Sequence, residues 1–146
     1  MSNLLNAFIV AAFIVQSPAH AEKKYGPGVT DSEIKLGQTM PYSGPASALS
    51  GAGKANAAYF AMVNTSGGVN GRKIKLISLD DGYSPPKTVE QTRKLVESEQ
   101  VLALFSPLGT ASNSAIHKYV NVNKVPHLFI GSNLMRWAIR NISPGP

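Results

Sequence analysis

The chain has 146 residues, of which 43% are hydrophobic and 15% are charged, and it carries a net charge of +6. This length suits one ordinary domain, and the low charged fraction excludes disorder of the highly charged kind. Because there is no cysteine, disulfides, zinc–thiolate sites and thiol nucleophiles are excluded as well. Lysine and arginine are dispersed along the chain, so the net charge predicts no nucleic-acid partner.

The first 21 residues predict a cleavable signal peptide. An apolar run from Leu4 to Val15 leads to the small-x-small sequence Ala19-His20-Ala21. The run is shorter than the roughly 20 apolar residues that a membrane-spanning helix needs. A buried N-terminal helix is the alternative. We expect export to a bacterial periplasm, where disulfides are permitted but not required, and an N-terminal extension over residues 22–32.

Strand-like and helical patterns alternate after residue 32. Glu33 to Thr39 alternates apolar and polar residues, as a half-buried strand does. Lys73 to Leu79 is apolar on both faces, which is typical of a strand in a sheet covered on both sides. Between them, apolar residues recur at helical spacing and predict an inward stripe. Its members are Ala55, Ala58, Tyr59, Met62 and Val63.

The second half of the chain repeats this alternation. A helix opens at Ser84-Pro85-Pro86, with Ser84 expected as its N-cap, and precedes a short apolar strand over Val101 to Phe105. A polar loop over residues 106–112 leads into a third helix, and His127 to Ile130 reads as a fourth strand. The inward residues expected on the two helices are Val89, Leu95, Val96, Ile116, Tyr119 and Val120.

The order β-α-β-α-β-α-β predicts an α/β fold, with a parallel sheet, right-handed crossovers and helices on both faces. We expect this domain to span residues 33–132. Residues 133–146 contain Trp137 but no clear periodicity, and we expect a divergent or truncated tail there.

The loops at the carboxyl ends of the strands are where an open parallel sheet binds ligands. At one of them, the start of the third helix offers free N–H groups together with the hydroxyls of Thr110 and Ser112. Free N–H groups and the helix dipole both favour a carboxylate or another anion. The alternative is that Thr110 or Ser112 only caps the helix.

Other candidate chemistry is weak in this sequence. Asp80-Asp81 could contribute to a Mg²⁺ site, but no third ligand is apparent, so turn formation or capping is favoured and we predict no metal. There is no nucleophile elbow and no P-loop, and we predict no cofactor. His117 is expected at a helix surface and His127 at a strand start, which favours structural roles for both.

Several motifs, taken together, resemble the periplasmic solute-binding proteins of branched-chain amino acid ABC transporters, the leucine/isoleucine/valine-binding kind with a type I periplasmic binding fold. The resemblance covers roughly Asp31 to Ile130. The motifs that carry it are Gly37 to Pro45, Val63-Asn64, Gly67 to Ile74, Asp80 to Pro85, Phe105 to Thr110 and Val125 to Phe129.

The resemblance implies a protein of two hinged lobes, of which this chain would supply an N-terminal fragment, the first part of the first lobe. It places Thr110 at a hydroxyl position that contacts the ligand carboxylate, with Ala111 and Ser112 beside it. It also matches Leu49 to a position that often carries an aromatic residue over the ligand side chain, and it places Ser132 in the fourth loop. The implied function is capture of an amino acid and delivery to an ABC permease in the inner membrane, without an enzymatic step.

Two further interpretations stay open on the sequence alone. One is a self-sufficient flavodoxin-like α/β domain with an enzymatic or nucleotide-binding role, whose site would be Asp80-Asp81 and the loop over residues 106–112. The other is a non-functional remnant, in which Val101 to Phe105 or His127 to Ile130 forms an exposed edge strand prone to aggregation.

Overall fold

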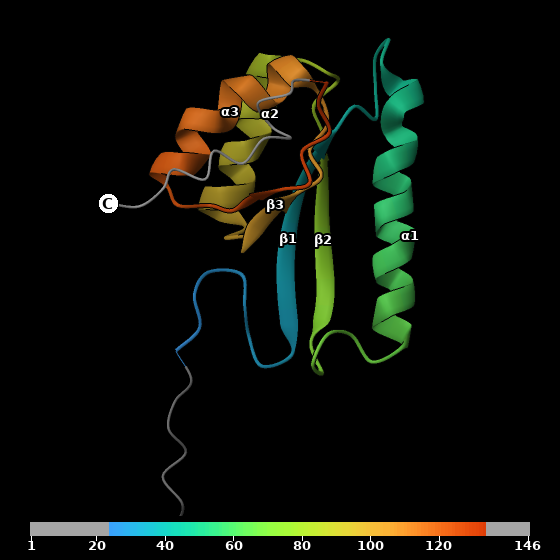
Figure 1. The fold of residues 1–146 in the computed structure, drawn as a ribbon, viewed down its shortest axis with the longest axis vertical. Helices are drawn as coiled ribbons and strands as arrows, with labels where there is room; N and C mark the ends of the chain where they lie inside the picture. Colours follow the sequence, from blue (N-terminus) through green and yellow to red (C-terminus); the bar gives the residue numbers. More distant parts are fainter. Residues whose placement is uncertain (1–23, 134–146) are drawn as a thin grey trace, which may run out of the picture.

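The computed structural model describes residues 24–133, so the predicted signal peptide and all of the predicted tail except Asn133 lie outside the described residues. Its core is one four-stranded sheet with the strand order β2-β1-β3-β4, in which all neighbours are parallel (Figure 1). The strands are β1 (Glu33–Met40), β2 (Lys73–Asp80), β3 (Ala103–Phe105) and β4 (His127–Leu128).

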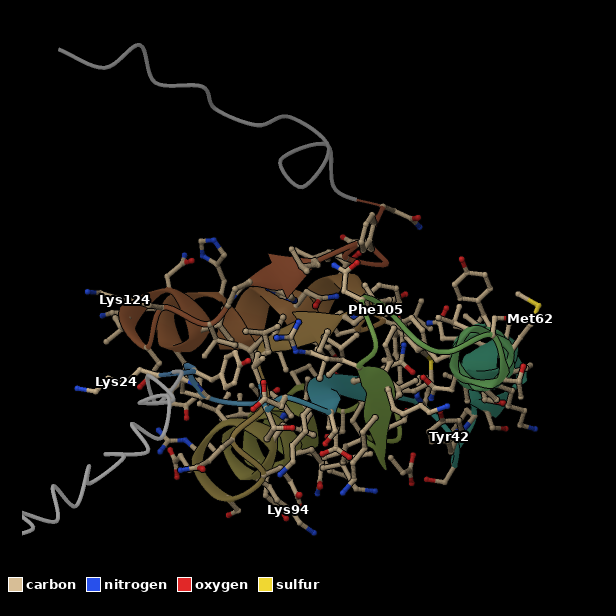
Figure 2. All side chains as sticks on the ribbon, turned by 90° about the horizontal axis from the view of Figure 1, so that it is seen from below. Lys24, Tyr42, Met62, Lys94, Phe105 and Lys124 are labelled. Carbon is tan, nitrogen blue, oxygen red and sulfur yellow. The ribbon has the colours of Figure 1, made fainter. Side chains whose placement is uncertain are left out.

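Helices cover both faces of this sheet. Helix α1 (Gly51–Thr65) lies on one face, and α2 (Pro85–Arg93) and α3 (Thr110–Val122) lie on the other (Figures 1 and 2). Right-handed crossovers require this arrangement, because the chain moves from β1 to β2 in one direction and from β2 through β3 to β4 in the other. The predicted α/β fold with a parallel sheet is therefore confirmed.

The hydrophobic core lies between the sheet and the α2/α3 pair. A π-helical turn, η2 (Lys94–Ser98), extends α2 and carries Leu95 into this core. The predicted inward residues Ile116 and Val120 of α3 are fully buried, and Tyr119 packs against them. The buried members of the core are Leu95, Val101, Leu104, Ile116 and Val120.

The predicted inward stripe of α1 is wrong. Tyr59 and Met62 are 58% and 57% exposed, whereas the buried residues of this helix are Gly53 and Phe60. A Cβ added at Gly53 would lie 2.5 Å from the Tyr42 hydroxyl. Close approach of α1 to the sheet is therefore possible only with Gly53 turned inward, and this fixes the rotation of the helix about its axis.

Element boundaries differ from the prediction at two functional positions. The third helix begins at Thr110, inside the stretch predicted as loop. Strand β4 ends at Leu128, two residues earlier than predicted, because Phe129 adopts a φ of 52° and leaves the extended conformation. Within residues 24–133, no helix is both long and apolar enough to cross a membrane.

Candidate functional site

Four loops leave the carboxyl ends of the strands at the same edge of the sheet, because the strands are parallel. The first contains the short 3-10 helix η1 (Ser47–Ser50), which carries Leu49 with half of its surface exposed. The others are residues 81–84 after β2, residues 106–109 after β3 and residues 129–133 after β4. Open parallel sheets bind their ligands at this edge, which is therefore the position of the candidate site.

The N-terminus of α3 is free of side-chain capping. Gly109 is the N-cap residue, with a φ of 113° that favours glycine, and no side-chain hydrogen bond caps the helix. The first intrahelical bond runs from the Asn113 N–H to the Gly109 carbonyl at 2.9 Å. The interpretation of Thr110 or Ser112 as a cap is therefore wrong. The N–H groups of Thr110, Ala111 and Ser112 have no partner within the helix.

Thr110 and Ser132, which are 22 residues apart, meet at this helix end. Their hydroxyl oxygens are 3.0 Å apart, and the Asn133 N–H donates to the Thr110 hydroxyl at 3.3 Å. The Gly109 N–H donates to the Gly131 carbonyl at 2.8 Å and so holds the two loops together. Two of the predicted site residues thus form one polar group next to the free N–H groups of α3.

Ser112 points in a different direction. It is only 2% exposed, and its hydroxyl is hydrogen-bonded to the Thr88 hydroxyl at 2.8 Å. Thr88 is in turn bonded to a carboxyl oxygen of Asp81 at 2.8 Å, and both residues are fully buried. The side chain of Ser112 therefore joins α3 to α2 and the β2 end, and only its backbone N–H belongs to the helix terminus.

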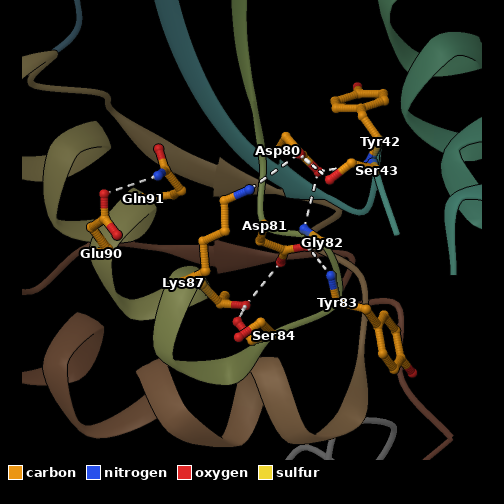
Figure 3. A network of polar contacts seen from close by, with 11 residues as sticks. Tyr42, Ser43, Asp80, Asp81, Gly82, Tyr83, Ser84, Lys87, Glu90 and Gln91 are labelled. Atoms are coloured by element: carbon orange, nitrogen blue, oxygen red, sulfur yellow. Dashed lines mark hydrogen bonds and ion pairs between the residues drawn. The ribbon is translucent and has the colours of Figure 1, made fainter. Parts of the chain in front are cut away.

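Asp80 ties the first loop to the second (Figure 3). Its carboxyl oxygens accept hydrogen bonds from the backbone N–H groups of Tyr42, Ser43 and Gly82 and from the Ser43 hydroxyl. Lys87 Nζ lies 3.2 Å from Oδ2 of the same carboxyl group and forms an ion pair with it. The hydrogen bond from the Ser43 hydroxyl, supported by the backbone N–H groups and by Lys87, holds the pKa of Asp80 below its usual range.

The carboxyl group of the adjacent Asp81 also accepts hydrogen bonds from within the fold. Its second carboxyl oxygen accepts the Tyr83 N–H at 2.9 Å, as Asp80 accepts the Gly82 N–H at 3.0 Å, so both aspartates form turns of the Asx type (Figure 3). In the part of the chain that the structure describes, no group of three or more metal-ligating side chains comes together.

Tyr83 is a residue of this edge that the sequence did not single out. It is 41% exposed, and its ring lies so close to Gly109 that a Cβ added there would be 3.1 Å from Tyr83 Cε2. Its side chain leaves the aspartate network rather than joining it (Figure 3). Tyr83 lies within the Asp80 to Pro85 motif, but only the contact across two loops reveals its place beside the start of α3.

Asn113 and His127 form a second buried connection under the site. Asn113 is fully buried and donates to the carbonyls of Pro107 and Gly109 at 3.1 and 2.7 Å. Its Oδ1 lies 2.9 Å from His127 Nε2. Because this oxygen can only accept, His127 donates from Nε2. Burial, with a smaller contribution from the charge of His117, lowers the pKa of His127 to about 4.

We expect stability to fall as the pH drops from about 6.5 toward 4. An unfolded chain protonates His127 near its ordinary pKa of 6.5, whereas the folded chain resists protonation until about 4. The unfolded state therefore binds more protons in this window, which favours unfolding. The full difference between the unfolded and folded pKa of His127 corresponds to about 3 kcal/mol of the free energy of unfolding. We expect a loss of about 2 kcal/mol, because the ring is partly exposed. Urea unfolding at several pH values measures it.

Two glutamine variants provide the control for this pH dependence. His127→Gln keeps a donor for Asn113 but cannot titrate, so its stability should be nearly flat across the window. His117→Gln replaces an exposed ring that lies 3.1 Å from the Asn121 amide nitrogen and should keep most of the slope. The loss of the Asp80 interactions develops mainly below the usual aspartate pKa of 3.8 and contributes little above pH 4. An unchanged slope in His127→Gln would contradict the assignment.

Comparison with known proteins agrees with this geometry. A family model described as periplasmic binding protein matches residues 33–141. The Leu/Ile/Val-binding protein homolog 7 of Brucella abortus is 28% identical over 109 residues, which are 73% of this chain and 27% of that protein.

Two solved structures are similar in sequence and in fold. A fatty acid ABC transporter substrate-binding protein from Thermomonospora curvata is 34% identical with a TM-score of 0.64, covering 75% of this chain and 27% of that one. A possible leucine/isoleucine/valine-binding protein from Rhodopirellula baltica is 28% identical with a TM-score of 0.65, covering 73% and 30%.

The chain belongs to the periplasmic binding protein family. Its described residues form a parallel α/β sheet that corresponds to part of a lobe of the type I members. The chain spans only about 27% of the length of the curated relative that it matches.

Proposed function

We propose that this chain acts in solute capture for an ABC importer and supplies the carboxylate-binding end of one lobe. The observation that carries the proposal is the uncapped N-terminus of α3 with the Thr110–Ser132 hydroxyl pair beside it. The family match and the names of the relatives support a small-molecule ligand, with branched-chain or related amino acids as the first class to test.

The groups at this edge suit a carboxylate without any covalent chemistry. The N–H groups of Thr110 and Ala111 can donate to one oxygen, and the Thr110 hydroxyl can donate to the other. Leu49 and Ser132 line neighbouring loops, and Ser112 would contribute through its N–H alone. The aspartates that an enzymatic interpretation would need are committed to hydrogen bonds within the fold. We therefore propose a binding protein rather than an enzyme.

The same contacts limit the affinity of this chain on its own. Hydrogen bonds that involve a charge contribute about 1.5–3 kcal/mol each, and a helix terminus adds about 0.3–1 kcal/mol. Micromolar affinity needs about 8.2 kcal/mol, and immobilising the ligand costs several more. Two or three contacts that stay open to water fall short of this requirement. We expect millimolar binding of leucine at best, and calorimetry that gave a micromolar constant would contradict this expectation.

Export is the second part of the proposal. Residues 1–21 have the order of features of a signal peptide, and the family to which the chain belongs is periplasmic by description. We propose that the chain reaches a bacterial periplasm and that an inner-membrane ABC permease is its partner in a complete system. Fractionation of cells that express the chain, with mass determination of the exported form, tests cleavage after Ala21.

Thr110 provides the direct test of the site. We expect Thr110→Ala to weaken leucine binding by at least about tenfold, because one charge-assisted hydrogen bond of about 1.5 kcal/mol or more is lost, with little change in stability. Titration of the ¹⁵N-labelled chain with millimolar leucine measures this through the amide shifts of Thr110 and Ala111.

Thr65→Ala is the matched control for this test. It makes the same substitution at an exposed threonine in the last turn of α1, whose hydroxyl donates to the Met62 carbonyl at 2.7 Å. This end of α1 lies at the opposite edge of the sheet from the candidate site (Figure 1), so leucine binding should be unchanged. Equal affinity in both variants would remove Thr110 from the site.

A further inference from the structure

A two-residue turn lies in the connection from α1 to β2. Asn70 and Gly71 form its corner, with φ values of 50° and 77°, the two left-handed values that a type I′ turn requires. Val69 and Arg72 flank the corner and pair with each other. The Val69 N–H donates to the Arg72 carbonyl at 2.8 Å, and the Arg72 N–H donates to the Val69 carbonyl at 3.0 Å. The turn lies at the edge of the sheet opposite to the candidate site (Figure 1).

Two groups that can react with each other are free in this corner. Asn70 and Gly71 are both exposed. Among residues 24–133, neither the side-chain amide of Asn70 nor the N–H of Gly71 takes part in a hydrogen bond. Beyond the chain neighbours, no heavy atom lies within 4 Å of a Cβ added at Gly71, and glycine itself has no side chain to shield its nitrogen. The Gly71 nitrogen can therefore reach Cγ of Asn70 with only the turn rearranged.

We propose that Asn70 is a site of spontaneous modification at which the side-chain amide nitrogen is lost. The Gly71 nitrogen attacks Cγ of Asn70 and forms a new C–N bond. The bond from Cγ to Nδ2 breaks, and Nδ2 leaves as ammonia with the proton that the Gly71 nitrogen releases. A solvent water then opens the five-membered imide ring at one of its two carbonyl carbons. One opening gives aspartate, and the other gives isoaspartate, in which the backbone runs through the former side chain.

A second pair of this kind, Asp81-Gly82, is present in the chain, and the fold protects it. Asp81 is fully buried, and its carboxyl oxygens accept the Tyr83 N–H at 2.9 Å and the Thr88 hydroxyl at 2.8 Å. The nitrogen that would attack belongs to Gly82, whose N–H donates to Asp80 at 3.0 Å. Both reacting groups are held here, whereas both are free in the turn before β2. The structure thus selects which of the two pairs reacts.

Isoaspartate breaks the turn. It adds one carbon atom to the backbone of a corner that has only two residues, so Val69 and Arg72 cannot keep both of their hydrogen bonds. Arg72 also holds the N-terminal extension. Its Nε donates to the Thr30 carbonyl at 2.8 Å, and its guanidinium lies 5.3 Å from the centre of the Tyr25 ring. The modification therefore loosens the extension from the start of β2. Neither hydrolysis product regains the lost nitrogen, so the modified fraction increases with the age of the chain.

Storage of the purified full chain in mildly alkaline buffer tests the proposal. Peptide mapping by mass spectrometry locates each conversion of amide to acid, and isoaspartyl methyltransferase measures isoaspartate. We expect Asn70 to react at least about tenfold faster than Asn113, because Gly71 leaves its nitrogen unshielded and because Asn113 is fully buried with both amide atoms hydrogen-bonded. Asn70→Gln, whose side chain would have to close a six-membered ring, should remove almost all of the isoaspartate at this position.

Asp81→Asn is the matched control, because it places a second Asn-Gly pair in the same chain at a buried position. Position 81 should react at least about tenfold more slowly than Asn70 in the folded chain, and the two rates should converge in urea, where the fold no longer holds either pair. Equal rates in the folded chain, with circular dichroism showing that Asp81→Asn is folded, would overturn the proposal. A rate at Asn70 no higher than at Asn113 in the unaltered chain would overturn it without any variant.

The amide shifts of Val69 and Arg72 test the consequence for the turn. They should move in the isoaspartate form and stay in freshly prepared Asn70→Asp, because an Asp-Gly pair also suits a type I′ turn. Unchanged shifts in the isoaspartate form would contradict the predicted loss of the turn. None of these measurements uses a ligand, so the proposal is tested separately from the proposed function.

Discussion

Phe60→Ala should lower the free energy of unfolding by about 3–5 kcal/mol, whereas Tyr59→Ala should lower it by about 1 kcal/mol or less. Phe60 is 7% exposed and is the large apolar residue that α1 buries against the sheet, while Tyr59 is 58% exposed. Removing the Phe60 ring leaves a cavity next to Phe105. Equilibrium urea unfolding of both variants measures the difference.

The two positions are adjacent aromatic residues of one helix, so helix propensity and composition are matched between them. A loss at Tyr59 equal to or greater than the loss at Phe60 would mean that α1 is rotated by about 100° from the observed position, as its apolar spacing alone suggests. Met62→Ala is a second control, since Met62 is 57% exposed and belongs to the same wrongly predicted stripe. It should also change stability by about 1 kcal/mol or less.

This helix marks the limit of what the sequence could predict about the fold. The alternation in β1 predicts the first strand, and the short run that is apolar on both faces predicts β2. The spacing of Ile116 and Val120 predicts the inward side of α3, because it places both residues on one side of the helix. Helix α1 is rich in alanine and has apolar residues on more than one side. Its rotation depends on Gly53 passing over Tyr42, a contact made through the fold and absent from any local pattern.

The sequence likewise predicts some features of the candidate site and not others. The sequence predicts free N–H groups at the start of α3 because a parallel sheet brings helix N-termini to its carboxyl edge. The resemblance to the family also implies that Thr110 and Ser132 lie in two loops of the ligand site. In the structure their hydroxyl oxygens are 3.0 Å apart. The inward direction of the Ser112 hydroxyl follows from the packing of α3 on α2, so residue type and spacing could not predict its bond to Thr88.

Asp81→Ala should lower the free energy of unfolding by about 3 kcal/mol and displace the N-terminus of α3. The fully buried carboxyl group accepts the Tyr83 N–H and the Thr88 hydroxyl, and Thr88 carries the connection to Ser112 in the first turn of α3. Hydrogen bonds to a charged group contribute about 1.5–3 kcal/mol each, and a buried donor without a partner adds a desolvation cost. Asp81→Asn, which keeps one acceptor oxygen, should lose about half as much.

Glu90→Ala removes an exposed carboxyl group from the same helix as Thr88 and should change stability by about 0.5 kcal/mol or less. Urea unfolding ranks the three variants, and ¹⁵N amide shifts of Thr110 and Ala111 report on the helix end. We expect these shifts to move in Asp81→Ala and to stay in Glu90→Ala. If Asp81→Ala were as stable as Glu90→Ala, the buried chain from Asp81 through Thr88 to Ser112 would not hold α3 in place. The geometry of the carboxylate-binding end would then have to rest on the bonds from Gly109 to Gly131 and from Thr110 to Ser132 alone.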